Sequence, residues 1–144
     1  MAPVREVYTY TSGTGQGSSV IPLAPSSSSI GTTLTNTAEI RNSGNILLYD
    51  KRGNNVGKLI SNRNVNFYEN NNLGYVSNST YLFNDGSYVM TLGWVNSNTT
   101  TLPPNAKYVR KAISTGGTYS GKEVTVTFKT DETPIRKIIF EYEK

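Results

Sequence analysis

The stretch from Gly116 to Lys122 has the spacing of a nucleotide-binding loop, with two glycines separated by four residues and a lysine directly after the second. A P-loop needs Ser or Thr after that lysine, because the hydroxyl binds magnesium, and it needs a helix after the loop. Here Glu123 follows Lys122, and the next residues alternate between apolar and polar as in a half-buried strand. The sequence therefore predicts a glycine-rich turn and no nucleotide site.

The chain contains neither histidine nor cysteine. This excludes Ser-His-Asp and Cys-His catalysis, disulfides, thiolate metal sites and histidine-rich zinc sites. We therefore expect no metal site and no cofactor, and any acid–base chemistry must come from carboxylates and phenols.

Among the ten acidic residues, Asp50, Asp85 and Asp131 stand in turn sequences, where an aspartate bonds to nearby backbone N–H groups. Glu6 and Glu39 are the acids in strand-like contexts that could face the interior of a barrel. A buried carboxylate with a raised pKa can act as a general acid or base. Glu6 and Glu39 are therefore weak catalytic candidates, and no residue is assigned a catalytic role.

The chain has ten tyrosines, and Tyr8, Tyr10 and Tyr49, together with Trp94, are candidate ligand-binding residues. A lumen lined with tyrosine offers flat apolar surface and hydroxyl groups to an aromatic ligand. Sheets and subunit interfaces also favour tyrosine without any ligand. Both interpretations stay open at this point.

The elements that must position these residues are strands, because no segment shows a helical period. The hairpin signal is strongest at Asn84-Asp85-Gly86. Eight or nine short strands joined by turns favour a single antiparallel barrel or sandwich spanning residues 1–144, and a closed barrel leaves no exposed edge. The predicted strand segments are 4–10, 32–42, a hairpin at 45–60, 64–69, 75–83, 87–95, 106–113, 122–130 and 135–143.

One long segment, at about residues 11–31, is rich in Gly, Ser and Pro and is predicted to be a flexible arm or loop. Four apolar residues are spaced through it, and they favour packing of the arm across a neighbouring subunit or another protein. These predicted assembly residues are Val20, Ile21, Leu23 and Ile30.

Four segments, in order, resemble the allene oxide cyclase and dirigent protein superfamily. The resemblance covers about 100 residues, and its segments are LYDKRGNNVGKL (Leu48–Leu59), YLFNDGSYVMTLG (Tyr81–Gly93), AISTGGTYSGKEVTVTF (Ala112–Phe128) and RKIIFEY (Arg136–Tyr142). It implies an all-β, closed, antiparallel eight-stranded barrel, commonly a homotrimer, with an apolar lumen that cyclases and isomerases use. The glycine loop here is shortened before Tyr119, the cyclase cysteine is missing, and the first strand has only Glu6 near the position of the cyclase acid. The fold therefore carries over better than the chemistry.

The net charge of +4 is scattered, which is not typical of a nucleic-acid patch, and no apolar run is long enough for a membrane span. The N-terminus lacks the apolar core of a signal peptide, so we expect a location in the cytoplasm or within a virion or other assembly.

These observations leave two function classes. The first is a non-catalytic oligomeric barrel, a structural or interaction protein with copies of itself and other proteins as partners; a virion component is one version. The alternative is a cofactor-independent isomerase or cyclase, or a carrier of a small apolar ligand, that uses the lumen. A lumen filled with side chains favours the first class, and an open apolar pocket containing Glu6 or Glu39 favours the second.

Overall fold

The structure is a computed structural model, and it describes residues 3–11, 16–23, 38–67, 73–97, 105–130 and 134–144. Among these residues no helix is long and apolar enough to cross a membrane. A three-residue 3-10 helix, η2 (Gly117–Tyr119), follows the seventh strand. The strands are β1 (Val4–Thr11), β2 (Gln16–Leu23), β3 (Ala38–Tyr49), β4 (Asn55–Phe67), β5 (Leu73–Phe83), β6 (Tyr88–Ser97), β7 (Lys107–Gly116), β8 (Thr125–Lys129) and β9 (Ile135–Tyr142).

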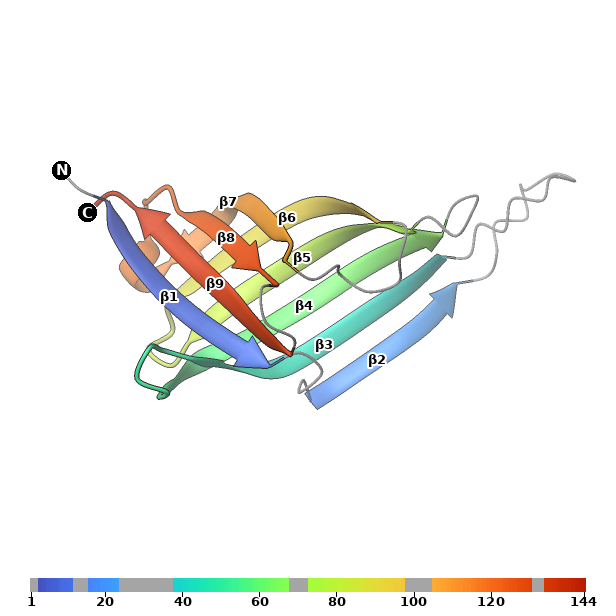
Figure 1. Cartoon of the computed structure of the whole chain (residues 1–144), viewed down its shortest axis with the longest axis horizontal. Helices are drawn as coiled ribbons and strands as arrows, with labels where there is room; N and C mark the ends of the chain where they lie inside the picture. The colour runs from blue at the N-terminus through green and yellow to red at the C-terminus, as the bar shows by residue number, and fades with distance from the viewer. Residues whose placement is uncertain (1–2, 12–15, 24–37, 68–72, 98–104, 131–133) are drawn as a thin grey trace, which may run out of the picture.

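All these strands belong to one antiparallel sheet with the order β1-β9-β8-β7-β6-β5-β4-β3-β2 (Figure 1). The first strand pairs with β9 along its whole length and also meets β3, where Thr9 lies opposite Tyr49. That second pairing closes eight strands into a barrel and leaves β2 outside the ring. The predicted closed antiparallel eight-stranded barrel is thereby confirmed.

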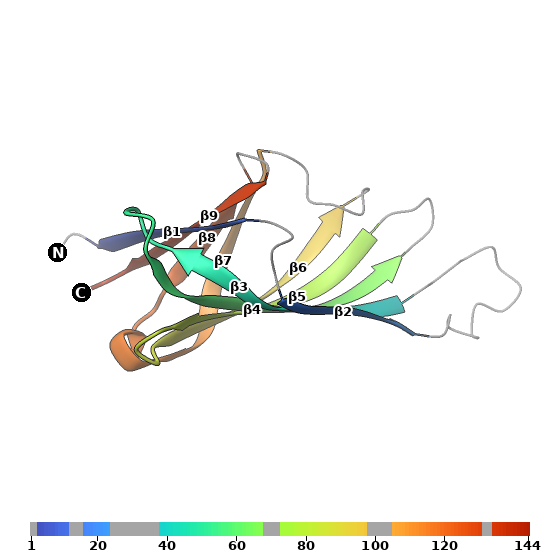
Figure 2. The same cartoon turned by 90° about the horizontal axis from the view of Figure 1, so that it is seen from below.

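The barrel is closed over only part of the length of its longest strands. One edge of β3 is shared, because β1 meets it at Tyr49 while β2 pairs with it from Ala38 to Gly44. In the described chain, the ladder between β6 and β7 covers only Tyr88–Thr91 of β6. The remaining parts of β3, β4, β5 and β6, together with β2, continue beyond the barrel as an open sheet, here called the extension (Figures 1 and 2).

The extension accounts for the main differences from the predicted strands. Predicted segments 32–42 and 45–50 join into β3, and segment 64–69 joins β4, because long strands pass through the barrel wall into the extension. The prediction of a loop was wrong for Gln16–Leu23, which forms β2 opposite β3. Val20, Ile21 and Leu23 lie in this strand, whereas Ile30 lies outside the described residues.

The interior of the barrel is filled by apolar side chains that alternate along the strands. Phe140 is fully buried and lies at the centre of this core. Its ring centroid is 5.3 Å from that of Tyr81, 5.4 Å from Tyr8, 5.6 Å from Tyr119 and 5.9 Å from Phe83. Such edge-to-face contacts stabilise the core beyond the burial of area alone. The other side chains with at most 1% exposure are Leu48, Val89, Val124, Val126, Ile138 and Thr130.

The turns follow the predicted chemistry. The Asp50 carboxylate accepts bonds from the backbone N–H groups of Arg52 (2.9 Å) and Asn54 (3.0 Å), and that of Asp85 accepts from Ser87 (2.8 Å). These bonds lower the pKa of both aspartates, and they confirm the structural interpretation of Asp50 and Asp85. Asp131 lies outside the described residues.

The glycine-rich stretch at Gly116–Lys122 is not a P-loop. Gly117 and Gly121 adopt φ values of +61° and +74°, which a residue with a side chain rarely adopts. The chain then forms one turn of 3-10 helix and strand β8, and no α-helix stands after the loop. The ammonium group of Lys122 lies 4.8 Å from the centre of the Tyr142 ring, so it packs on the barrel end.

We expect Phe140→Ala to lower the free energy of unfolding by about 3–5 kcal/mol, because it removes the ring that the other core aromatics contact. Urea unfolding followed by circular dichroism measures the loss. The matched control is Ile113→Ala, whose side chain is 58% exposed on the same sheet and should cost within about 0.5 kcal/mol. Equal losses in the two variants would show that the core is not where the structure places it.

Candidate functional site

The first strand carries a carboxylate and a phenol into the barrel. Glu6 lies opposite Phe140 and Tyr8 lies opposite Ile138, and both partners are fully buried on the inner face. Since residues directly opposite in an antiparallel pair share a face, Glu6, Tyr8 and Tyr10 point inward. Glu6 is nearest the end of the barrel where β1 begins, β9 ends and η2 lies, here called the mouth (Figure 1).

The short helix η2 brings a second phenol to the mouth. Its start is fixed by Ser87, whose hydroxyl oxygen accepts a bond from the Thr118 N–H at 3.0 Å and donates to the Thr118 hydroxyl at 3.1 Å. Gly117 must be glycine for this contact, because a Cβ there would clash with Ser87. The turn places Tyr119 against the core with 4% exposure, so its hydroxyl reaches the carboxylate on β1.

Three side chains form a hydrogen-bonded group at the mouth. The Tyr119 hydroxyl donates to Glu6 Oε1 at 2.8 Å. The Tyr8 hydroxyl lies 3.3 Å from the Tyr119 hydroxyl, so the phenols are also linked to each other. The rings are held by Phe83, whose centroid is 5.2 Å from Tyr8 and 5.6 Å from Tyr119. We call Glu6, Tyr8 and Tyr119 the mouth triad.

Burial keeps the phenols neutral. Desolvation, followed by the charge of Glu6, raises the pKa of Tyr8 to about 12, although its bond to Tyr119 opposes the shift. Desolvation also raises the pKa of Tyr119, as do its contacts with Tyr8 and Glu6. The pKa of Tyr142 is raised for the same two reasons, burial and the Glu6 carboxylate. At neutral pH these tyrosines therefore act as hydrogen-bond donors and not as bases.

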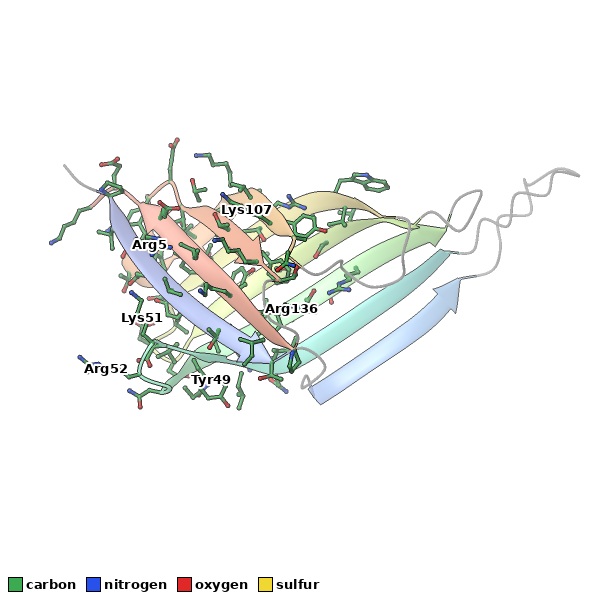
Figure 3. The ribbon with its side chains drawn as sticks, in the orientation of Figure 1. Arg5, Tyr49, Lys51, Arg52, Lys107 and Arg136 are labelled. Carbon is green, nitrogen blue, oxygen red and sulfur yellow. The ribbon has the colours of Figure 1, made fainter. Side chains whose placement is uncertain are left out.

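Two hollows meet at the mouth triad. One, of about 360 Å³, is lined by Glu6, Tyr8, Phe83 and Tyr119 together with polar residues of the β5–β6 hairpin. The other, of about 290 Å³, is lined by Glu6 and Tyr8 and by a basic rim of Arg5, Lys51 and Arg52. Figure 3 shows these three basic residues at the same end of the barrel.

The arrangement offers a carboxylate acceptor beside aromatic faces. It can bind a hydroxyl or N–H donor attached to a flat ring, and it lies at the wall of a hollow of ligand size. Within the described part of the chain, no three His, Cys, Asp or Glu side chains come together to hold a metal ion.

The structure brings together some of the predicted site residues and separates others. Tyr8 and Tyr10 lie inside the barrel, as the ligand-binding hypothesis required. Trp94 is 49% exposed on the outer face of β6, and Tyr49 lies opposite the outward-facing Thr9. These two residues therefore do not line the lumen.

The two catalytic candidates lie at opposite ends of the molecule. Glu39 is at the start of β3, in the extension, opposite Val65. Glu6 lies three residues from Thr9 on β1, and Glu39 lies ten residues from Tyr49 on β3, in the opposite direction from the Thr9–Tyr49 pair. At the usual rise per residue of a strand, the two glutamates are roughly 40 Å apart along the sheet. The two carboxylates cannot act as a pair.

Sequence reasoning missed Tyr119 and Tyr142 as neighbours of Glu6. The only available signal for Tyr119 was its place in the glycine-rich stretch, which was correctly predicted to be a turn followed by a strand. The strand that Tyr119 contacts is set by the order of the strands in the sheet. No local sequence pattern of this chain specifies that order.

Neither the comparison with protein-family models nor the search of curated proteins finds a match to this chain. The likeness to the allene oxide cyclase and dirigent superfamily thus remains a resemblance of sequence motifs.

We expect Glu6→Gln to lower the pKa of Tyr8 from about 12, because the negative charge that disfavours the phenolate is removed. The absorbance of tyrosinate at 295 nm, followed from pH 9 to pH 12.5, measures the shift. The raised pKa means that Tyr8 stabilises the fold fully below its unfolded pKa of about 10, and that this contribution is lost as the pH rises through 12. The control is Glu141→Gln, which removes the same charge from the opposite face of β9; if it shifts the curve as far, the inward placement of Glu6 is contradicted.

Proposed function

We propose that this chain is a non-catalytic interaction and assembly protein, in which the closed barrel is a rigid block and the extension is the contact surface. The observation that carries the proposal is the filled lumen. Phe140 is fully buried and contacts four aromatic rings, so the space that a lumen enzyme would keep for its substrate is occupied by side chains.

The protonation states at the mouth support the same proposal. Tyr8 and Tyr119 are neutral at physiological pH, and one oxygen of Glu6 already accepts the Tyr119 hydroxyl. A general base must be free to take a proton from its substrate. The mouth triad is better suited to hold a structure or a ligand than to move protons.

The extension supports an assembly role by its position. It continues four strands, β3 to β6, beyond the ring, and it ends in β2 as its edge strand. An edge strand offers backbone donors and acceptors to another chain. The homotrimer is added to this proposal by the family resemblance alone, and a virion component is one version of the assembly.

The assembly proposal predicts that the full chain is an oligomer and that charges in β2 weaken it. The variant Val20→Asp with Ile21→Asp introduces two carboxylates into β2, so a partner that covers this strand must bury charge. We expect the dissociation constant to rise by at least about tenfold. Light scattering over a dilution series measures it.

The barrel should stay folded in this variant, because β1 closes the ring through β9 and β3 without β2. Far-UV circular dichroism and thermal melting verify this. The matched control is Ser18→Asp with Ser19→Asp, which adds the same charges to β2 but keeps its apolar side chains. A parent chain that is a strict monomer would remove the assembly proposal.

A second candidate function is binding of a small aromatic ligand at the mouth. It is favoured by the hollow of about 360 Å³, in which the Glu6 carboxylate lies beside the rings of Tyr8 and Phe83. Buried polar groups with convergent apolar walls are the usual features of a ligand site.

This candidate predicts that p-cresol, which has one ring and one hydroxyl, binds the parent chain and binds Glu6→Gln at least about tenfold more weakly. Isothermal titration calorimetry measures both affinities, with Glu141→Gln as the control of equal charge. Equal affinity of the parent and Glu6→Gln would exclude the mouth triad as the binding group.

A further inference from the structure

The end of the barrel opposite the mouth, here called the far end, is where the lumen meets the extension. Two half-buried arginines lie there on the inner face, Arg136 on β9 and Arg110 on β7. Arg136 lies opposite Tyr10 of β1, and Arg110 lies opposite Val126 of β8; both partners are buried lumen residues. Figure 3 shows Arg136 at the start of β9, away from the chain termini.

Arg136 has an unsatisfied charged group. Its Nη1 atom is buried and has no hydrogen-bond partner. A buried guanidinium N–H without an acceptor costs more than an ordinary missing hydrogen bond, because the group carries charge. Such an atom in a folded chain points to an acceptor that binds from outside.

Arg110 is held in place by the backbone. One terminal nitrogen donates to the Val109 carbonyl and the other to the Trp94 carbonyl, both at 3.1 Å. Its stem lies across Gly93 of β6, where a Cβ would clash with it, and its guanidinium packs 5.8 Å from the Tyr108 ring centre. A guanidinium has five N–H donors, so this arginine keeps donors for a further acceptor.

Tyr81 links the two arginines. The charge of Arg110 lowers the pKa of the Tyr81 phenol and Tyr10 raises it, so both groups lie near Tyr81. Tyr10 is in turn the cross-strand neighbour of Arg136. Burial raises the pKa of Tyr81, with Tyr10 adding to the shift, so it remains a neutral donor. Arg63, on the inner side of β4 two residues after buried Ser61, adds a third positive charge toward the extension.

The described carboxylates lie elsewhere. Glu6, Asp50 and Asp85 are at the mouth, and Glu39 is further along the extension. Near the C-terminus, Glu123 comes just before β8 and Glu143 just after β9, both at the mouth end. Glu141 lies on the outer face of β9. Among the described residues, the charged side chains that face the lumen at the far end are therefore arginines.

We propose that Arg110 and Arg136, with the hydroxyls of Tyr10 and Tyr81, form a binding site for one oxyanion, a phosphate or carboxylate group, at the far end of the lumen. Guanidinium groups bind such oxyanions through paired N–H donors, and charge-assisted bonds of this kind are about twice as strong as neutral ones. The site is independent of the assembly role and of the mouth triad.

Thermal unfolding of the full chain tests the proposal, with sodium chloride replaced stepwise by sodium phosphate at fixed pH and ionic strength. We expect the melting temperature to rise and then saturate, because the anion binds only the folded chain. Arg136→Gln should weaken apparent phosphate affinity by at least about tenfold. Arg136→Lys keeps the charge but loses the paired donors, and it should weaken binding while preserving the fold.

The matched control is Lys137→Gln, which removes the same charge from an exposed, outward-facing position on β9 and should leave phosphate affinity unchanged. Repeating the titration with succinate distinguishes the two sources of the oxyanion: an equal effect indicates a carboxylate ligand, and an effect of phosphate alone indicates a phosphorylated one.

Three results would overturn the proposal. The first is a parent chain that phosphate stabilises no more than chloride does. The second is an equal loss of affinity in Lys137→Gln and Arg136→Gln, which would mean that only overall charge matters. The third is phosphate binding that arises only in Asp131→Asn with Glu132→Gln, because the chain's own carboxylates would then be the partners of Arg136.

Discussion

The double pairing of β1 is the constraint on which the rest of the structure depends. This strand meets β9 along its whole length and β3 at the Thr9–Tyr49 pair, and it thereby turns an open sheet into a ring. Closure decides which residues face inward, because side chains alternate along every strand. Because β1 pairs with β3 only near Tyr49, β2 pairs with the other end of the same edge of β3. The long strands therefore continue past the ring as the extension.

The ring separates two polar environments with an apolar core between them. Phe140 and its neighbouring rings pack in the centre between the two ends. The mouth holds a carboxylate bonded to a neutral phenol, and the far end holds arginines beside neutral phenols. Burial of the phenols at each end raises the pKa of Tyr8 and of Tyr81.

This distribution explains why a barrel fold alone does not define an activity for this chain. Barrels that act as enzymes keep an open lumen with positioned groups, whereas this one packs its lumen with side chains as a protein core does. The functional possibilities lie where the packing stops, at the two ends of the ring and on the extension. Specific side chains distinguish these places, Glu6 and Tyr119 at the mouth and Arg136 at the far end.

The sequence by itself determined most strands of the barrel, the turns at Asp50 and Asp85, and the absence of a P-loop, because these depend on alternation and local turn chemistry within a few residues. It did not determine β2, whose pairing is supplied by β3, or the exposure of Trp94, since alternation names a face but not which face is inside. Only the tertiary structure decided that Tyr119 meets Glu6, 113 positions away in the chain, and that Arg136 is buried without an acceptor. Contacts of this kind depend on strand order and closure, which are set by the whole sheet at once.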